Sequence, residues 1–247
     1  MQMKFAVVVG ASSGIGREVA RLLLRQGWTL GVAARREERL LELQREAGQM
    51  VPSAQVFVER IDVTAADAVE RLEDLVRRMG GMDLFFYASG IGKQNRTLNA
   101  DIELATMQTN AVGFTRMVGA AFRYFAAHGG GHIAAITSIA GTKGLGPAPA
   151  YSATKAMQNV YLQALEQQAR QRALPICITD IRPGFVDTDL LSGDFSYPMM
   201  LRPQSVAKAI VRAIERKQHV RVIDWRYRLL TAVWRWIPDA VWRRMKL

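Results

Sequence analysis

Residues 10–16 read Gly-Ala-Ser-Ser-Gly-Ile-Gly and join an apolar, β-branched run at 4–9 to a run with helical apolar spacing at 17–26. A strand, a glycine-rich turn and a helix in this order are the context that a phosphate-binding turn requires. Gly10 allows a tight turn, and Gly14 and Gly16 let the backbone approach a pyrophosphate that the helix N-terminus attracts. A glycine-rich turn without a ligand is the alternative.

Strand and helix patterns alternate along the chain to about residue 223. We expect strands at 4–9, 29–34, 55–60, 83–88, 132–137, 175–181 and 220–223, with helices at 17–26, 36–48, 65–79, 102–127, 151–172 and 203–216. Strands that alternate with helices of this length predict an α/β fold with a parallel, doubly wound sheet and right-handed crossovers. We expect a single catalytic domain at 1–224 with about seven strands and helices on both faces.

The polar and glycine-containing segments of this chain fall directly after the expected strands. In an open parallel sheet, ligands bind outside the carboxyl ends of the strands. These ends carry the glycine turn 10–16, Arg35, Asp62, Gly90, Ser138 and the segment 183–188. Their coincidence at one edge predicts a binding site there.

The segment Tyr151-Ser152-Ala153-Thr154-Lys155 opens a helical run, so the phenol of Tyr151 and the ammonium of Lys155 share one helix face. An unperturbed phenol has a pKa of about 10, and a nearby cation favours the phenolate. The pair is therefore a candidate proton donor and acceptor tuned toward neutral pH. By itself the spacing also occurs by chance in many helices.

The second strand ends in Arg35-Arg36 instead of an acidic residue. An acid at this place would accept hydrogen bonds from the ribose 2′-hydroxyl of NAD, whereas an arginine can meet the 2′-phosphate of NADP. We therefore predict NADP(H) as the cofactor. The alternative is that both arginines form a solvated helix start.

The long helix expected at 102–127 contains Gly113 and Gly119, with Asn110 near its middle. A glycine inside a helix costs about 1 kcal/mol relative to alanine. We therefore expect close packing or backbone distortion around Asn110.

The chain carries a formal net charge of +11 and one cysteine among 247 residues. No intrachain disulfide can form, no apolar stretch reaches the roughly 18 residues of a membrane span, and no signal peptide is visible. We expect a cytoplasmic protein. A basic chain can be drawn to nucleic acid, anionic membrane or phosphorylated ligands, but nothing here suggests a nucleic-acid-binding fold. We predict no metal site.

Together these segments resemble the short-chain dehydrogenase/reductase family, over about residues 4–223. The resemblance rests on the glycine turn 10–16, Asp62-Val63, Asn110, Ser138, the segment 151–155 and Pro183-Gly184-Phe185-Val186-Asp187-Thr188. It implies a Rossmann-type fold and a homodimer or homotetramer. One departure is Tyr87-Ala88-Ser89-Gly90, where the family often has Asn-Asn-Ala-Gly.

The resemblance implies a catalytic set of Asn110, Ser138, Tyr151 and Lys155. Tyr151 would protonate the substrate oxygen during reduction, Ser138 would hold that oxygen, and Lys155 would lower the pKa of Tyr151 and bind the nicotinamide ribose. Asn110 would anchor a water that links Lys155 to solvent. Asp62 and Val63 would flank the adenine, and Val186 and Thr188 the carboxamide. The cofactor residues expected in full are Gly10, Ser12, Ser13, Gly14, Ile15, Gly16, Arg35, Arg36, Asp62, Val63, Ala88, Gly90, Tyr151, Lys155, Pro183, Gly184, Val186 and Thr188.

The function expected is NADP(H)-dependent hydride transfer between nicotinamide and a ketone/alcohol pair, with Tyr151 as general acid/base. The substrate loop, about 186–202, suggests a hydrophobic substrate through its apolar residues Leu190, Leu191, Phe195, Tyr197, Met199, Met200 and Leu201. The competing interpretation is a catalytically silent cofactor-sensing or scaffold protein with the same fold.

Residues 225–247 form a basic tail that the family does not require, and they hold four of the five tryptophans. Leu230, Val233, Trp234 and Ile237 share one face of an expected amphipathic helix. Interleaved Trp and Arg on such a helix are typical of interfacial membrane binding. The alternative is that this face packs on the catalytic domain, roofs the substrate cleft or forms an oligomer contact.

Overall fold

The seven strands that the structure describes form one parallel sheet in the order β3-β2-β1-β4-β5-β6-β7. Our computed structural model describes residues 4–189 and 199–245. The strands are β1 (Phe5–Val9), β2 (Thr29–Ala34), β3 (Val56–Arg60), β4 (Leu84–Tyr87), β5 (Gly131–Ile136), β6 (Ile176–Arg182) and β7 (Val220–Val222). The predicted doubly wound sheet is confirmed, and each expected strand lies within one or two residues of its predicted bounds.

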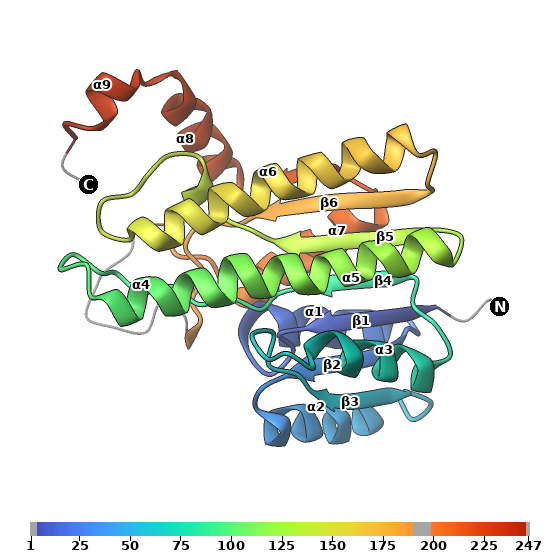
Figure 1. The fold of residues 1–247 in the computed structure, drawn as a ribbon. Coiled ribbons are helices and arrows are strands. Elements are labelled where there is room, and N and C mark those ends of the chain that lie inside the picture. The colour runs from blue at the N-terminus through green and yellow to red at the C-terminus, as the bar shows by residue number, and fades with distance from the viewer. Residues whose placement is uncertain (1–3, 190–198, 246–247) are drawn as a thin grey trace.

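Helices cover both faces of the sheet (Figure 1). One apolar core joins the sheet to α3 (Ala68–Met79), α5 (Phe114–Ala127) and α6 (Pro149–Gln171). The other joins it to α1 (Gly14–Arg25), α2 (Glu37–Met50) and α7 (Pro203–Glu215). All six residues of β2 are buried, as expected for a strand that helices cover on both sides.

The strand order reverses between β1 and β4, the two strands at the centre of the sheet. From β1 the chain moves outward to β2 and β3, then crosses back to β4 and continues to β7. Such a switch point opens a crevice between neighbouring connections at the carboxyl ends of the strands. The ligand site predicted at these ends therefore has a physical place in the fold.

The long helix predicted around Asn110 is divided into three parts. A π-helical turn, Gln108–Gly113, separates α4 (Ala100–Met107) from α5. A Cβ atom on Gly113 would lie 2.7 Å from the Cγ2 atom of Val63, so this glycine lets the helix pack closely on the end of β3. Both the close packing and the backbone distortion that the sequence predicts are present, which confirms this expectation.

The tail forms α8 (Trp225–Trp236) and the short α9 (Asp239–Trp242), which lie beyond the carboxyl ends of the strands (Figure 1). The buried side of α8 carries Tyr227 and Thr231. The apolar face expected from the sequence is wrong in part, because Val233 is 52% exposed whereas Leu230 and Trp234 are half-buried. The apolar spacing did not identify the buried side, because α8 has apolar residues on two opposite sides.

Most of the predicted substrate loop, including Leu190, Leu191, Phe195 and Tyr197, lies outside the described residues. The two ends of this loop meet, because Val186 pairs with Leu201 in an isolated bridge. In the described parts of the chain, no helix has the length and apolar character needed to cross a bilayer.

Candidate functional site

The glycine turn after β1 is packed too tightly to accept larger residues. Gly10 has a φ of +92°, a conformation that favours glycine, and its N–H donates to the Ala33 carbonyl at 2.7 Å. A Cβ atom on Gly16 would lie 2.2 Å from the Gly10 oxygen. At Gly14 the nearest side-chain atom to such a Cβ would be Cγ2 of Thr188, at 3.1 Å. Gly10 and Gly16 thus hold the turn on the sheet, and Gly14 borders the segment after β6.

The two arginines after β2 point to different neighbours. Arg36 donates from Nη2 to the hydroxyl of Ser13 at 2.7 Å and to that of Ser12 at 3.2 Å. Arg35 is exposed, and its charge acts on Asp62. Burial raises the pKa of Asp62, but hydrogen bonds from Thr64 and the charge of Arg35 outweigh it, so the net direction is downward. This rim of the site favours an anion.

Tyr151 and Ser138 meet inside the site. Burial raises the pKa of Tyr151, and a hydrogen bond with Ser138 opposes that rise. The direction is opposite to the sequence expectation of a phenol tuned toward neutral pH, because Lys155 lies 5.7 Å from the ring centroid and directs its ammonium elsewhere. The backbone of Gly92 abuts the ring, since a Cβ atom there would lie 2.7 Å from it. The phenol is therefore neutral near pH 7, which is its proton-donating form.

Lys155 is 4% exposed and is held by two acceptors. Its Nζ donates to the Ile136 carbonyl at 3.2 Å and to Oε1 of Gln158 at 3.0 Å. Burial lowers the pKa of Lys155 to about 8, although the charge of Asp180 acts to raise it. A group of this pKa changes charge close to physiological pH.

Gln158 extends this arrangement to the π-helical turn. The side chain is 0% exposed, and its Nε2 donates to the main-chain carbonyl of Asn110 at 2.7 Å. One buried amide therefore bridges Lys155 to Asn110. We call this set of Asn110, Lys155 and Gln158 the polar centre.

The Asn110 side chain fixes the loop that follows β4. Its Oδ1 accepts from the Ile91 N–H at 2.9 Å, and its Nδ2 donates to the Ile91 carbonyl at 2.7 Å. The neighbouring Gly90 faces the same group, because a Cβ there would lie 3.3 Å from Oδ1 of Asn110 and 3.8 Å from Nζ of Lys155. Tyr87, where the family often has asparagine, instead packs edge-on against Phe114 at 5.2 Å between ring centroids.

The segment after β6 closes the opposite side of the site. The Pro183 carbonyl accepts from the Ile139 N–H at 3.1 Å. A Cβ on Gly184 would lie 2.2 Å from the ring of Tyr227, so this glycine lets α8 approach. The Tyr227 hydroxyl accepts from the Phe185 N–H at 3.3 Å and donates to the Met199 carbonyl at 3.0 Å. The tail is thus a structural part of the site.

These groups surround a single cleft of about 820 Å³ at the carboxyl ends of the strands. Every predicted cofactor residue lines it, as do Ser138, Tyr151 and Lys155. Asn110 lies behind the wall, bonded to Ile91. Among the described residues, no group of three His, Cys, Asp or Glu side chains could hold a metal ion.

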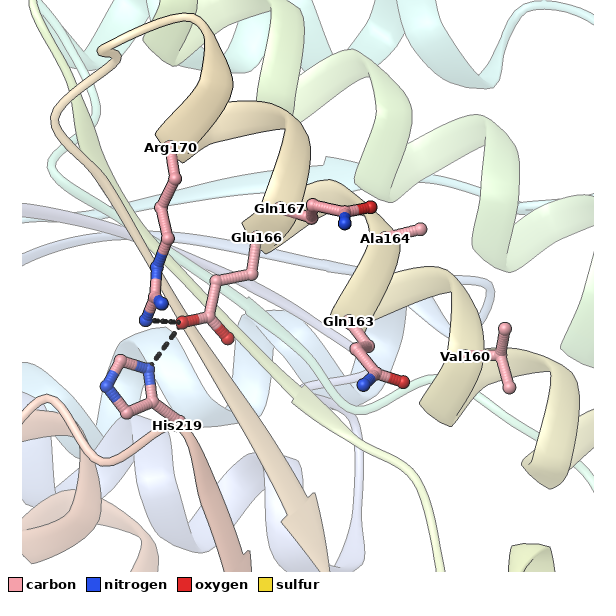
Figure 2. Close-up of a pocket in the computed structure, with 7 residues that line it drawn as sticks. All are labelled: Val160, Gln163, Ala164, Glu166, Gln167, Arg170 and His219. Atoms are coloured by element: carbon pink, nitrogen blue, oxygen red, sulfur yellow. Dashed lines mark hydrogen bonds and ion pairs between the residues drawn. The ribbon is translucent and has the colours of Figure 1, made fainter.

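A second hollow lies on the outer side of α6 and has a different character (Figure 2). In it, Glu166 accepts from Arg170 at 2.7 Å and from Nδ1 of His219 at 2.6 Å. His219 precedes β7, so the hollow lies toward the amino ends of the strands. It contains neither the glycine turn nor the Tyr151–Lys155 pair, and the candidate site is the cleft.

The family model for short chain dehydrogenases matches residues 4–196 of this sequence. The chain belongs to the short-chain dehydrogenase/reductase family. It is 32% identical over 236 residues to an uncharacterized oxidoreductase of Mycobacterium tuberculosis, covering 94% of this chain and 89% of that one. The resemblance inferred from the motifs is therefore confirmed.

Two solved structures of the family share the fold. An alcohol dehydrogenase from the archaeon Thermococcus sibiricus, complexed with 5-hydroxy-NADP, is 26% identical with a TM-score of 0.79, covering 90% of this chain and 96% of that one. A short-chain dehydrogenase/reductase from Burkholderia phymatum, complexed with NAD, is 20% identical with a TM-score of 0.83, covering 94% and 92%. Members of the family thus bind NADP or NAD.

The cleft fits a nicotinamide dinucleotide. The backbone of Gly14, at the N-terminus of α1, borders the cleft with no side chain of its own, and Arg35 and Arg36 stand at the same end. Tyr151, Ser138 and Lys155 stand further along the wall. The cleft therefore combines a glycine turn and two arginines with a neutral phenol.

Sequence reasoning missed several residues of the site, namely Ile91, Gly92, Gln158 and Tyr227. Gln158 could have been predicted from the sequence, because a residue three positions after Lys155 shares its helix face. Ile91 and Gly92 sit in an irregular loop whose path no periodicity indicates. Tyr227 comes from the tail, and its contact with Gly184 depends on how α8 docks.

Proposed function

We propose that the protein is an NADP(H)-dependent oxidoreductase that reduces the carbonyl group of a hydrophobic ketone or aldehyde. The observation that carries the proposal is the convergence of Ser138, Tyr151 and Lys155 on the wall of the cleft that the glycine turn also lines. A proton donor and an anion-binding helix N-terminus in one cleft are what carbonyl reduction with a dinucleotide requires.

The residues of the site divide the work of handling the substrate oxygen. Tyr151, half-buried and neutral, donates its phenolic proton to that oxygen, while the Ser138 hydroxyl hydrogen-bonds it and orients it. The ammonium of Lys155 points to Ile136 and Gln158 and not to the phenol, so we assign Lys155 to binding the nicotinamide ribose. The polar centre keeps that ammonium in place through Gln158. Bound NADPH would supply the hydride.

The end of β2 supports NADP(H) over NAD(H). The two residues directly after the strand are arginines, and neither can accept from a ribose 2′-hydroxyl as an acid would. Arg35 is the side chain that we assign to the 2′-phosphate. Arg36 already donates to Ser12 and Ser13, so we assign it to holding the turn beside the phosphate.

The apolar part of the cleft supports a hydrophobic substrate. The wall of the cleft includes the apolar side chains of Ile91, Leu145, Phe185, Met199, Leu230 and Trp234. Burial of apolar surface contributes about 25 cal/mol for each Å² removed from water. A ketone with an aliphatic or aromatic body therefore gains more from this wall than a small polar one.

Turnover of a carbonyl panel by the Tyr151→Phe variant tests the proposal. Removal of the proton donor should lower NADPH oxidation by about 10²-fold or more, with NADPH binding and folding retained. Tyr161→Phe, on the same helix but away from the cleft, is the matched control and should retain full activity. Near-normal turnover by Tyr151→Phe would remove this residue from the mechanism.

The alternative function, a protein with the same fold and no catalytic activity, predicts a different result in the same experiment. A cofactor-sensing or scaffold protein would bind NADPH with no turnover of any carbonyl by the wild type. The arrangement of Ser138, Tyr151 and Lys155 favours the enzyme. The homodimer or homotetramer and the cytoplasmic location stay predictions.

A further inference from the structure

Helix α8 has apolar residues on two opposite sides, and only the inner side is covered. On the inner side, Tyr227 is 0% exposed and Thr231 is 4% exposed, while Leu230 and Trp234 line the cleft. On the outer side, Trp225 is 68% exposed and Trp236 is 87% exposed. One amphipathic face would have sufficed for packing, so the outer side needs its own explanation.

The exposed apolar residues of α8 form one continuous stripe. Trp225, Leu229, Val233 and Trp236 follow one another at intervals of four, four and three residues, which places them on one helix face. Leu229 is 60% exposed and Val233 is 52% exposed. Contiguous exposed apolar surface of this kind marks an interaction site rather than ordinary surface.

Arginine side chains lie beside this stripe on α8 and in the segment that follows α9. Arg228 and Arg235 are exposed on α8, and Arg243 and Arg244 follow α9. In the parts of the chain that the structure describes, these four form no ion pair, whereas the acids of the tail are engaged: Asp224 with Arg226, and Asp239 with Lys143. The outer side of α8 therefore combines exposed tryptophan with two arginines that no ion pair among the described residues neutralises.

The tail is anchored firmly to the catalytic domain. Trp242 donates from Nε1 to the Gly144 carbonyl at 2.7 Å and packs edge-on against Trp234 at 5.3 Å between ring centroids. Lys143 and Asp239 form an ion pair beside this contact. These contacts fix the stripe on the side of α8 that faces away from the cleft.

We propose that this outer face, defined by Trp225, Leu229, Val233 and Trp236 with Arg228 and Arg235 at its edge, docks on an anionic lipid bilayer. Tryptophan side chains bury favourably at the headgroup level, and arginine pairs with lipid phosphates. A second copy of the chain fits the face poorly, because a two-fold contact would bring the same arginines together without acids to neutralise them.

Docking through this face also bears on the substrate, a step that rests on the proposed function. Leu230 and Trp234 on the inner side of α8 line the cleft, so the cleft lies only one helix away from the bound bilayer surface. The substrate class that this arrangement favours is a long-chain ketone or aldehyde dissolved in the bilayer.

Sedimentation of the full chain with vesicles tests the docking. The protein should co-sediment with phosphatidylcholine vesicles that contain phosphatidylglycerol and stay in the supernatant with phosphatidylcholine alone. Binding should weaken at high salt, because the Debye length falls from about 10 Å at 0.1 M to about 3 Å at 1 M. A full chain that stays in the supernatant with anionic vesicles at low salt would overturn the proposal.

Two double variants separate this face from general positive charge. Each basic residue near an anionic surface contributes about 1 kcal/mol, so Arg228→Gln with Arg235→Gln should lower vesicle affinity by roughly 10- to 30-fold. Arg172→Gln with Arg216→Gln removes the same charge from exposed sites elsewhere and should retain nearly full binding. Equal losses for the two double variants would show that the whole charge, not this face, binds the lipid.

The apolar stripe has its own variant, Leu229→Ser with Trp236→Ser. It should abolish vesicle binding at low salt while NADPH oxidation with a water-soluble ketone stays at the wild-type level. Retained binding by this variant would overturn the docking proposal. Truncation after residue 224 is a poorer test, because it also removes the buried Tyr227 and Trp242.

The substrate step is measured separately. Anionic vesicles should stimulate reduction of a bilayer-dissolved ketone by the wild type and not by the stripe variant. Equal rates for the two proteins would overturn delivery from the bilayer. If no carbonyl is reduced at all, the proposed function fails, while sedimentation still decides the docking.

Discussion

Lys155 and Arg228 are both cationic residues on helices beside one cleft, but the protein treats their charges in opposite ways. Lys155 is 4% exposed and its ammonium bonds to the Ile136 carbonyl and to Gln158. Arg228 stands in solvent on the outer face of the tail. A buried charge must be paired or shift its pKa, whereas an exposed charge retains its hydration until a partner arrives.

This contrast separates what holds the site together from what the site presents to partners. The polar centre is costly to disturb, because each of its groups would leave another unpaired in the interior. The outer face can be changed with little effect on the fold, because its side chains have few neighbours to lose. Substitutions in the polar centre or the packed side of the tail, compared with substitutions on the outer face, can test this difference in cost.

The two tryptophans on opposite sides of the tail should give the largest contrast. Trp242 is 7% exposed and donates to Gly144, so Trp242→Ala should lower the free energy of unfolding by about 3–5 kcal/mol. Trp236 is 87% exposed, so Trp236→Ala should change it by less than about 0.5 kcal/mol. Urea denaturation of both variants measures the difference, and similar losses would show that the outer side is packed.

The charge of Lys155 should appear in the pH dependence of stability. Burial lowers its pKa from 10.5 to about 8. Between these values the unfolded chain still binds a proton that the folded protein has released, so folding is favoured as pH rises. From pH 8 to 10.5 the wild type should gain about 3 kcal/mol of unfolding free energy relative to Lys155→Met.

Denaturant titrations at several pH values measure this gain. The exposed Lys208→Met variant is the control and should show a constant difference from the wild type. A constant difference for Lys155→Met as well would mean that the buried ammonium has an ordinary pKa.

A substitution at the rim of the cleft should have an effect of intermediate size, seen in cofactor binding. A charge-assisted hydrogen bond contributes roughly 1.5–3 kcal/mol, so Arg35→Ala should weaken NADPH binding by about 10- to 100-fold and leave NADH binding almost unchanged. Fluorescence titration with both cofactors measures this selectivity. Arg39→Ala, on the exposed side of α2, is the control. Equal losses for both cofactors would make Arg35 a structural residue.

Gln158→Leu should cost about 1–3 kcal/mol of stability, because it leaves the Asn110 carbonyl unpaired. It should also lower the pKa of Lys155 further, since an acceptor of the ammonium is lost. The alkaline limb of the kcat profile should therefore move to lower pH. Gln168→Leu, exposed on the same helix, is the control. Lower stability with an unmoved limb would leave Gln158 a purely structural role.

Much of the fold follows from local patterns in the sequence. The alternation of strand and helix segments predicts the parallel sheet, and Gly113 beside Asn110 predicts the distorted helix that the structure contains as a π-helical turn. These inferences succeed because periodicity, glycine placement and turn chemistry act over a few residues. The residues expected at the cofactor site likewise line one cleft, because the carboxyl ends of parallel strands meet at one edge.

Only the tertiary structure decided which partners these residues contact. Lys155 shares a helix face with Tyr151, as the sequence predicts, but its ammonium turns to Gln158 and Ile136 because the neighbouring elements place acceptors there. Spacing along a helix tells which residues share a face and not what covers that face. In α8, with apolar residues on both sides, the choice of Tyr227 as the buried residue depended on the space above Gly184, a glycine 43 positions earlier in the chain.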